Sequence, residues 1–188
     1  MSGYKDLYDY CQTLSIKVSR KFILRKILEI TDIGQIKSVK TCLDVNASRG
    51  MFLSATNTNH RIVEQLGCNV ILLARDQNYC WERFVNTKEL MHVFDSNEQV
   101  ADLPEKLERI LTSFQVSSTG DQVIISEHIG FWRALACLCP EKYRLQFKEE
   151  LDNNLTDYYS IALKLRIPEQ IVPQLFIDNY EEIIAHIQ

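Results

Sequence analysis

The N-terminal part of the chain carries apolar side chains at the three- and four-residue intervals of an amphipathic helix. In the stretch YKDLYDYCQTLSIKVSRKFILRKILEIT, residues 4–31, these positions are Leu7, Tyr10, Leu14, Val18, Phe22, Ile23, Ile27 and Ile30. This spacing places apolar residues on one face of a helix. It predicts either one long helix or two consecutive helices.

The next segments favour extended structure around one short helix. The stretch TCLDVNASRGMFLSAT, residues 41–56, predicts a short strand, a turn at Ser48–Gly50 and a second extended piece. HRIVEQLG predicts a short helix that Gly67 closes. CNVILLARD, residues 68–76, is the clearest strand, since it is apolar and partly β-branched.

Helical spacing returns in WERFVNTKELMHVFD, which predicts a buried helix. Asn86 or Thr87 is a plausible N-cap for it by residue type, although the helix could begin several residues earlier. ADLPEKLERILTSF, residues 101–114, predicts an amphipathic helix with Pro104 in its first turn. A linker, SSTGDQVII, follows it.

The sequence predicts helices for the C-terminal third of the chain. SEHIGFWRALACLCPEKYRLQFKEEL predicts a helix that Ser126 caps and Pro140 interrupts. Residues 156–187 predict two or three short helices. The whole pattern indicates an α+β fold, rich in helix, with a small sheet that contains residues 69–74.

Composition supports one folded unit. The chain has 188 residues, of which 46% are hydrophobic, and only six Gly and four Pro. A chain of this size and hydrophobicity can bury a core as a single domain, 1–188. Within it, residues 1–40 form a basic helical segment.

The charge is unevenly distributed. The net charge is −4, yet residues 1–40 carry eight Lys/Arg against four Asp/Glu. The basic cluster consists of Lys17, Arg20, Lys21, Arg25 and Lys26. It is either the solvated face of an amphipathic helix or a docking surface for an acidic partner or a nucleic acid. The acidic body of the chain argues against nucleic acid.

The N-terminal residues contain no apolar secretory segment, and no apolar run approaches the roughly 20 residues of a membrane span. We therefore expect a cytoplasmic protein that does not enter a membrane. Its six cysteines should be reduced and mostly buried thiols. They include no C-x-x-C pair, and we expect no cysteine metal site.

The segment KELMH, Lys88 to His92, is close to the zinc-peptidase signature H-E-x-x-H. That spacing lets two imidazoles on one helical face share a metal, with the glutamate beside them as a base for the metal-bound water. Here Glu89 keeps the base position and His92 keeps the second ligand position. Lys88 replaces the first histidine, and a lysine ammonium has no lone pair for a metal.

Three segments together give the chain a resemblance to the ImmA/IrrE-type metallopeptidase family, over roughly residues 60–176. NVILLARDQNYCWERFVNTKELMHVFD is similar to the family's strand, turn and RFTxAHELGHxL helix. SEHIGFWRALACLCPEKYRLQF is similar to its E-x-x-A-x-x-F-A-x-x-L-L-x-P stretch, with Glu127 in the third-ligand position. LTDYYSIALKLRIPEQIVPQLF resembles its closing segment. The resemblance implies a zincin-like fold.

Two functions are compatible with this resemblance. In the first, the protein is an inactive relative whose Lys88 ammonium pairs with Glu127 or Glu89 in place of a metal. It would then bind a protein partner, such as a helix-turn-helix repressor or a toxin–antitoxin or phage component, and would need no cofactor. In the second, it is a zinc endopeptidase with Glu89 as base and His92 and Glu127 as ligands. His60 and His128 are the nearest candidates for a further ligand.

A third interpretation sets the resemblance aside and takes the chain as a helical adaptor or nucleic-acid-binding module. Basic residues interleaved with aromatic ones occur only around residues 17–26, which argues against it.

Overall fold

The computed structural model describes residues 3–57, 59–95 and 122–188, except for the side chains of residues 122–124. The described part is an α+β structure, rich in helix, with a three-stranded sheet, as the sequence predicts. The helices are α1 (Tyr4–Gln12), α2 (Arg20–Ile30), α3 (Arg61–Leu66), α4 (Tyr79–Met91), α6 (Gln122–Leu138), α7 (Glu141–Asp152), α8 (Tyr158–Leu165) and α9 (Tyr180–Ile187), with 3-10 helices η1 (His92–Phe94) and η2 (Glu169–Phe176). The strands are β1 (Ile36–Thr41), β2 (Gly50–Leu53) and β3 (Asn69–Ala74).

The sheet has the order β1-β3-β2, with β1 parallel and β2 antiparallel to the central strand. All six residues of β3 are buried, as its apolar sequence predicts. Ile71 and Leu73 belong to the main core, whereas Val70 and Leu72 belong to a second cluster. This alternation follows from the two-residue period of a strand. The sheet therefore has apolar packing on both faces.

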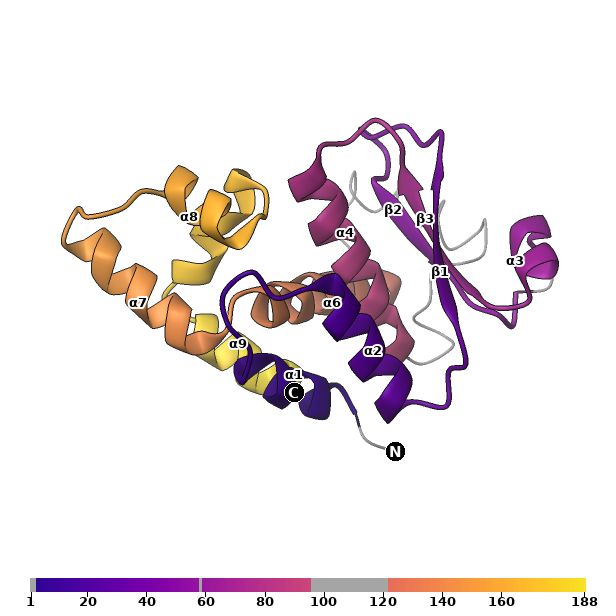
Figure 1. The fold of residues 1–188 in the computed structure, drawn as a ribbon, viewed down its shortest axis with the longest axis horizontal. Helices are drawn as coiled ribbons and strands as arrows, with labels where there is room; N and C mark the ends of the chain where they lie inside the picture. Colours follow the sequence, from indigo (N-terminus) through magenta and orange to yellow (C-terminus); the bar gives the residue numbers. More distant parts are fainter. Residues whose placement is uncertain (1–2, 58, 96–121) are drawn as a thin grey trace.

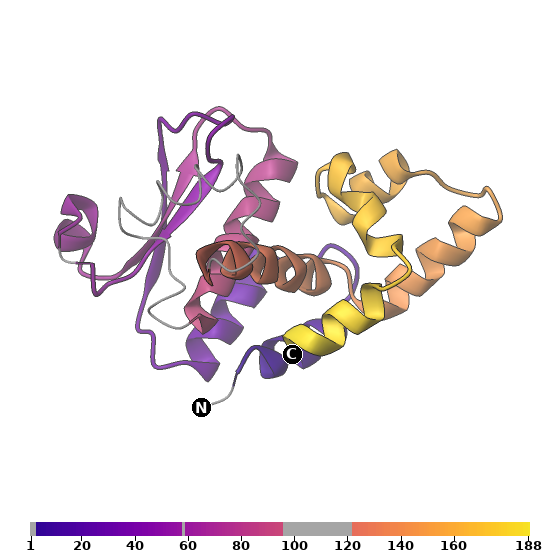
Figure 2. The ribbon, with the colours of Figure 1, turned by 180° about the vertical axis from the view of Figure 1, so that it is seen from behind.

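Helix α4 lies against one face of the sheet and links it to the helical half. It contacts β3 and β2 on one side and α6 and α2 on the others. Figure 1 shows α4 beside the sheet, and Figure 2 shows from behind that α6 runs between α4 and the C-terminal helices. The C-terminal half of the main core is centred on α6, whose residues 134–138 are all buried.

The N-cap predicted for α4, Asn86 or Thr87, is wrong, because the helix begins several residues earlier, as the sequence also allowed. Helix α4 begins at Tyr79, and the side chain of Asn78 caps it by accepting the backbone N–H of Trp81 at 3.0 Å. Asn86 and Thr87 are buried within the helix instead. Their polar groups are satisfied there, since the Asn86 amide donates to Ser38 and the Thr87 hydroxyl donates to a carbonyl one turn earlier.

The N-terminal segment forms two helices, which is one of the two alternatives that its spacing allows. The helical conformation is interrupted between them at Lys17, whose φ is 67°. Ser19 then caps α2 by accepting the backbone N–H of Lys21. Helix α1 packs on α6 through Tyr4, Leu7 and Cys11.

The first strand lies earlier than predicted. β1 ends at Thr41, where the sequence pattern placed its beginning, and the turn occupies residues 45–47. Asp44 closes that turn by accepting the backbone N–H of Asn46 at 2.9 Å, which moves the turn ahead of the predicted Ser48–Gly50 position. The second extended piece is confirmed as β2, and Gly67 ends α3 with a φ of 61°, as predicted.

Helix α6 begins at Gln122, so Ser126 lies inside it and is not the predicted cap. The break at Pro140 and the three short helices that follow α7 are confirmed. The predicted helix over residues 101–114, with Pro104, lies outside the described residues. Four of the six cysteines are buried and none forms a disulfide. Among the described helices, none is long and apolar enough to span a membrane.

Candidate functional site

The last turn of α4 and the second turn of α6 bring a lysine between two glutamates. The Lys88 ammonium nitrogen lies 2.9 Å from Glu89 Oε1 and donates a hydrogen bond to Glu127 Oε2. These are the contacts that we expect from the sequence for a lysine in this position. Glu89 is nearly inaccessible at 2% exposure, whereas the Glu127 side chain retains 30%.

His92 faces the same two carboxylates. Its Nε2 atom lies 3.3 Å from Glu127 Oε1 and 3.6 Å from Glu89 Oε2. The residue directly follows α4, so the helix places Lys88 and His92 on one face, four residues apart. The structure therefore brings Lys88, Glu89, His92 and Glu127 into one cluster, which we call the KEHE cluster.

A second layer of polar side chains orients the His92 ring. Nδ1 lies 2.6 Å from Asp95 Oδ2 and 3.1 Å from the Ser126 hydroxyl, which itself donates to Asp95. Arg133 adds a longer contact of 3.5 Å to the other Asp95 oxygen. Asp95 thus fixes the ring so that Nε2 points at the glutamates.

Sequence reasoning missed Asp95 and Arg133 and assigned Ser126 to a cap. The available signal was the spacing H-x-x-D, because a carboxylate three residues after a histidine can reach its ring within one helical turn. The serine, histidine and aspartate do not form a nucleophilic triad. Ser126 and Asp95 share the same ring nitrogen, whereas a triad needs them on opposite nitrogens.

The cluster shifts the ionisation of its members. Burial disfavours imidazolium, but the carboxylates of Asp95 and Glu127 outweigh it and raise the pKa of His92 to about 9. Burial also opposes the charge on Lys88, yet Glu89 and Glu127 raise its pKa above the usual lysine range. Against the opposing effect of burial, Lys88 and His92 lower the pKa of Glu127. Near neutral pH, both basic groups are therefore charged.

These properties do not fit a catalytic zinc centre of the kind that the resemblance implies. Such a centre needs three protein ligands with free lone pairs and one open position. A charged Lys88 has no lone pair and already contacts Glu89 and Glu127, so His92 is the one imidazole donor in the KEHE cluster. In the described ranges, no group of three His, Cys, Asp or Glu side chains is arranged to hold a metal ion.

The two additional histidines lie outside the cluster. His128 follows Glu127 on α6 and is exposed, so its ring does not point into the α4–α6 interface. His60 is the N-cap residue of α3. Figure 1 shows α3 at the far end of the sheet from the C-terminal helices. Neither position completes a ligand set with His92.

The basic cluster divides into two groups. Arg20 pairs with Glu82 of α4 at 3.5 Å, and Lys26 pairs with Glu29 of its own helix at 2.8 Å. Lys17, Lys21 and Arg25 are exposed. Helix α2 buries Ile23 and Ile27 on its opposite side, so most of this charge lies on the outer face of an amphipathic helix.

Comparison with known proteins identifies no relative: no family model, no curated protein and no solved structure matches this chain.

Proposed function

We propose that this protein is a metallopeptidase-like interaction protein, which binds a protein partner without cleaving it. The observation that carries this proposal is the position of the Lys88 ammonium between Glu89 and Glu127. In a zinc peptidase of the resembled type, a metal ion supplies positive charge to these carboxylates. Here a covalently attached cation supplies it.

The ammonium also removes the chemistry that a peptidase needs. A general base must reach a water molecule next to the substrate. Glu89 is 2% exposed and already contacts a charged amine, so it has neither the access nor the free charge for that role. An ammonium group cannot polarise a carbonyl or a water as a metal does. The remaining role of the cluster is to join α4 to α6.

The kind of partner comes from the resemblance alone. Proteins of the ImmA/IrrE type act on regulatory proteins, and we propose a transcriptional repressor or another regulator of a mobile element as the partner. A scaffold that retains the binding surface and loses the metal would hold such a protein without cutting it.

One observation favours the alternative of an active zinc endopeptidase. Within the described structure, the buried atoms His92 Nε2 and Glu89 Oε1 have ion-pair contacts, at 3.3 Å to Glu127 and 2.9 Å to Lys88, but neither contact has hydrogen-bond geometry. Buried polar atoms are normally satisfied, and atoms left over at a site can serve a ligand. Under this alternative, zinc would have to displace the ammonium from both glutamates.

Zinc content after purification without chelators separates the two functions. We expect less than about a tenth of an equivalent in the natural protein, because a lone histidine and carboxylates hold zinc weakly. The variant Lys88→His should bind near one equivalent, since it restores two imidazoles four residues apart beside Glu127. The variant Lys88→His with Glu127→Ala should lose most of it.

Each result has a distinct meaning. Stoichiometric zinc in the natural protein, lost on Glu127→Ala, would replace the interaction protein with the enzyme. No zinc in a folded Lys88→His variant would overturn the metallopeptidase-like origin of the site. Circular dichroism on all variants separates loss of metal from loss of fold.

A further inference from the structure

A pocket of about 250 Å³ lies on the other side of α4 from the KEHE cluster. Helices α2 and α4 and strands β1 and β3 form it together. Its lining consists of Arg20, Lys21, Leu24, Ile36, Ser38, Lys40, Leu73, Glu82, Asn86 and Leu90. The periods of the elements explain this lining, because Ile36, Ser38 and Lys40 alternate along β1 while Glu82, Asn86 and Leu90 repeat every four residues along α4.

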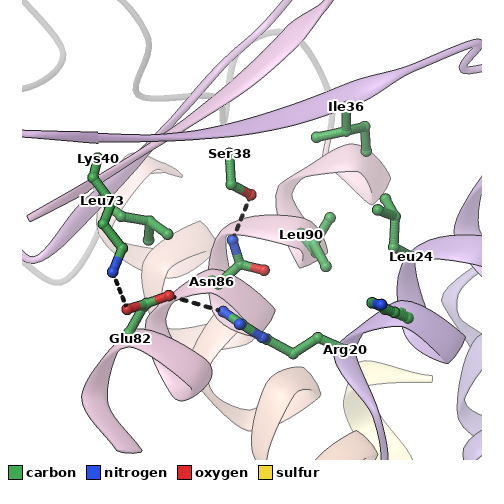
Figure 3. Close-up of a pocket in the computed structure, with 10 residues that line it drawn as sticks. Arg20, Leu24, Ile36, Ser38, Lys40, Leu73, Glu82, Asn86 and Leu90 are labelled. Atoms are coloured by element: carbon green, nitrogen blue, oxygen red, sulfur yellow. Dashed lines mark hydrogen bonds and ion pairs between the residues drawn. The ribbon is translucent and has the colours of Figure 1, made fainter. Parts of the chain in front are cut away.

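The pocket has a charged end and an apolar end. Figure 3 shows Arg20 and Lys40 pointing toward Glu82 at one end, with Leu24, Ile36 and Leu90 toward the other. The Asn86 amide donates to the Ser38 hydroxyl at 2.7 Å between them. A ligand that matches this lining is acidic at one side and apolar at the other.

The charged end has an excess of positive charge. Arg20 and Lys40 both contact the single carboxylate of Glu82, and Lys21 is a third basic residue in the lining, in a protein whose net charge is −4. Glu82 lies 2.8 Å from the Lys40 amine and 3.5 Å from the Arg20 guanidinium. An ammonium has three N–H donors and a guanidinium has five, so both retain donors for another acceptor.

Lys21 adds a cation that Glu82 does not neutralise. Its side chain is exposed and forms no ion pair within the described part of the chain. Like the side chain of Lys40, which is 55% exposed, it is open to an approaching carboxylate. Such contacts are electrostatic and should weaken with salt.

The size of the pocket limits what can enter. A cavity of about 150 Å³ is enough for benzene, whereas pockets for drug-sized ligands start at about 300 Å³. The value of 250 Å³ therefore suits one large apolar side chain and the backbone next to it.

We propose that this pocket binds an acidic segment of a partner protein, whose aromatic or large aliphatic side chain enters the apolar end. Aspartate or glutamate residues beside that side chain pair with Lys21, Lys40 and Arg20. Of the five basic residues near α2 that the sequence singles out, only Arg20 and Lys21 belong to this surface.

This inference rests on the proposed function only in that a protein partner exists. The two are tested separately, because the zinc experiment changes Lys88 and leaves the pocket untouched. Failure of peptide binding would remove the docking surface and leave the metal-free cluster as it stands. Zinc in the natural protein would change the enzymatic assignment and leave the pocket as a docking surface.

The test uses a synthetic peptide with the sequence Gly-Glu-Asp-Phe-Asp-Glu-Gly, capped at both ends, and the full-length protein labelled with ¹⁵N. We expect binding on the order of 0.1 to 1 mM, as for a short ligand that fills one pocket. The shifted amide signals should be those of Leu24, Ser38 and Asn86. Peptides with Gln and Asn in place of the acids, or Ala in place of Phe, should bind at least about fivefold more weakly.

Variants with opposite effects make the assignment specific. Lys21→Glu should weaken binding about five- to tenfold, whereas Glu82→Gln should strengthen it about two- to fivefold by removing the competing carboxylate. Lys148→Glu changes the net charge equally at an exposed site on α7 and should leave binding unchanged.

Four outcomes would overturn the proposal. They are the absence of shifts at millimolar peptide, equal binding of the uncharged peptide, an equal effect of Lys148→Glu and Lys21→Glu, and shifts confined to α6 or the C-terminal helices. Inorganic phosphate alone serves as a further ligand. If it reproduces the shifts at Leu24 with similar affinity, the pocket is a small-anion site and not a peptide site.

Discussion

Two faces of helix α4 carry ion-pair arrangements of opposite sign. On one face, the base Lys88 lies between two acids, Glu89 and Glu127. On the other, the acid Glu82 lies between two bases, Arg20 and Lys40. The central side chains are equally exposed, at 16% each. Their partners differ, since Glu89 is 2% exposed and Lys40 is 55% exposed.

This difference decides what each arrangement contributes. A buried carboxylate that loses its counter-ion keeps its desolvation cost, so Lys88, Glu89 and Glu127 depend on one another. An exposed lysine that loses its partner is solvated by water at little cost. The Lys88 side of the helix is therefore structural, whereas the Glu82 side has charges that are free to exchange partners.

The variant Lys88→Met should have the largest effect on the free energy of unfolding. It leaves Glu89 and Glu127 facing each other without the ammonium, and we expect a loss of about 2–4 kcal/mol in the free energy of unfolding. The partial exposure of Glu127 favours the lower part of this range. Urea denaturation followed by circular dichroism measures it.

Adding Glu127→Gln to Lys88→Met should recover about half of the loss, because one uncompensated charge disappears. Lys148→Met, on the exposed face of α7, is the control and should change stability by less than about 0.5 kcal/mol. A loss below about 1 kcal/mol for Lys88→Met would mean that the buried pair does not hold α4 to α6.

The pH dependence of His92 tests the same face without removing a side chain. Its pKa is raised to about 9 from an ordinary value near 6.5. The resulting stabilisation is complete below pH 6.5 and is lost as the pH rises through 9, with a total on the order of 3 kcal/mol. NMR titration of the imidazole signals measures the pKa directly.

The variant Asp95→Asn should lower the pKa of His92, since the Asp95 hydrogen bond is the main contribution that opposes burial. A midpoint near 6.5 in the natural protein would contradict the stabilisation of the charged His92 by Asp95 and Glu127.

The sequence predicts what local patterns control. Strand β3 was predictable because residues 70–74 form an apolar, partly β-branched run, and Gly67 because a left-handed helix end favours glycine. The predicted position of β1 was wrong. Only one of its six residues is buried, so the strand has a weak apolar signal in the sequence.

The site was predictable only in part. Lys88, Glu89, His92 and Glu127 could be grouped through the resemblance, although no local pattern joins α4 to α6. Ser126 has the residue type of a cap and is instead buried beside His92. The pocket has no local signature at all, since α2, β1, β3 and α4 form it only after they pack together.

Gly50 of β2 lies in close contact with the buried face of α4. A Cβ atom there would collide with the Val85 side chain and lie 3.2 Å from Glu89 Cγ. Gly50→Ala should therefore cost about 1–3 kcal/mol through overpacking between β2 and α4. Val85→Ala should offset part of this cost in the double variant. Gly34→Ala, where no atom lies within 4 Å, should be close to neutral, and thermal unfolding of all four proteins measures the contrast.

The smallest expected effect is that of Glu82→Gln on stability. The variant removes the central charge of the exposed arrangement, as Lys88→Met does on the buried side, yet Lys40 and Arg20 remain open to water at 55% and 31% exposure. We expect a loss below about 1 kcal/mol, shrinking further in 0.5 M salt, because surface pairs contribute little and are screened.

Lys40 and Arg20 hold the pKa of Glu82 below its usual value, so this small contribution should also disappear as the pH falls through that range. Denaturant titrations at two salt concentrations measure it, and a loss as large as that of Lys88→Met would erase the distinction between the two faces. A small loss in stability together with tighter binding of the acidic peptide would instead separate the two roles, since the same carboxylate would then contribute little to the fold and compete with the ligand.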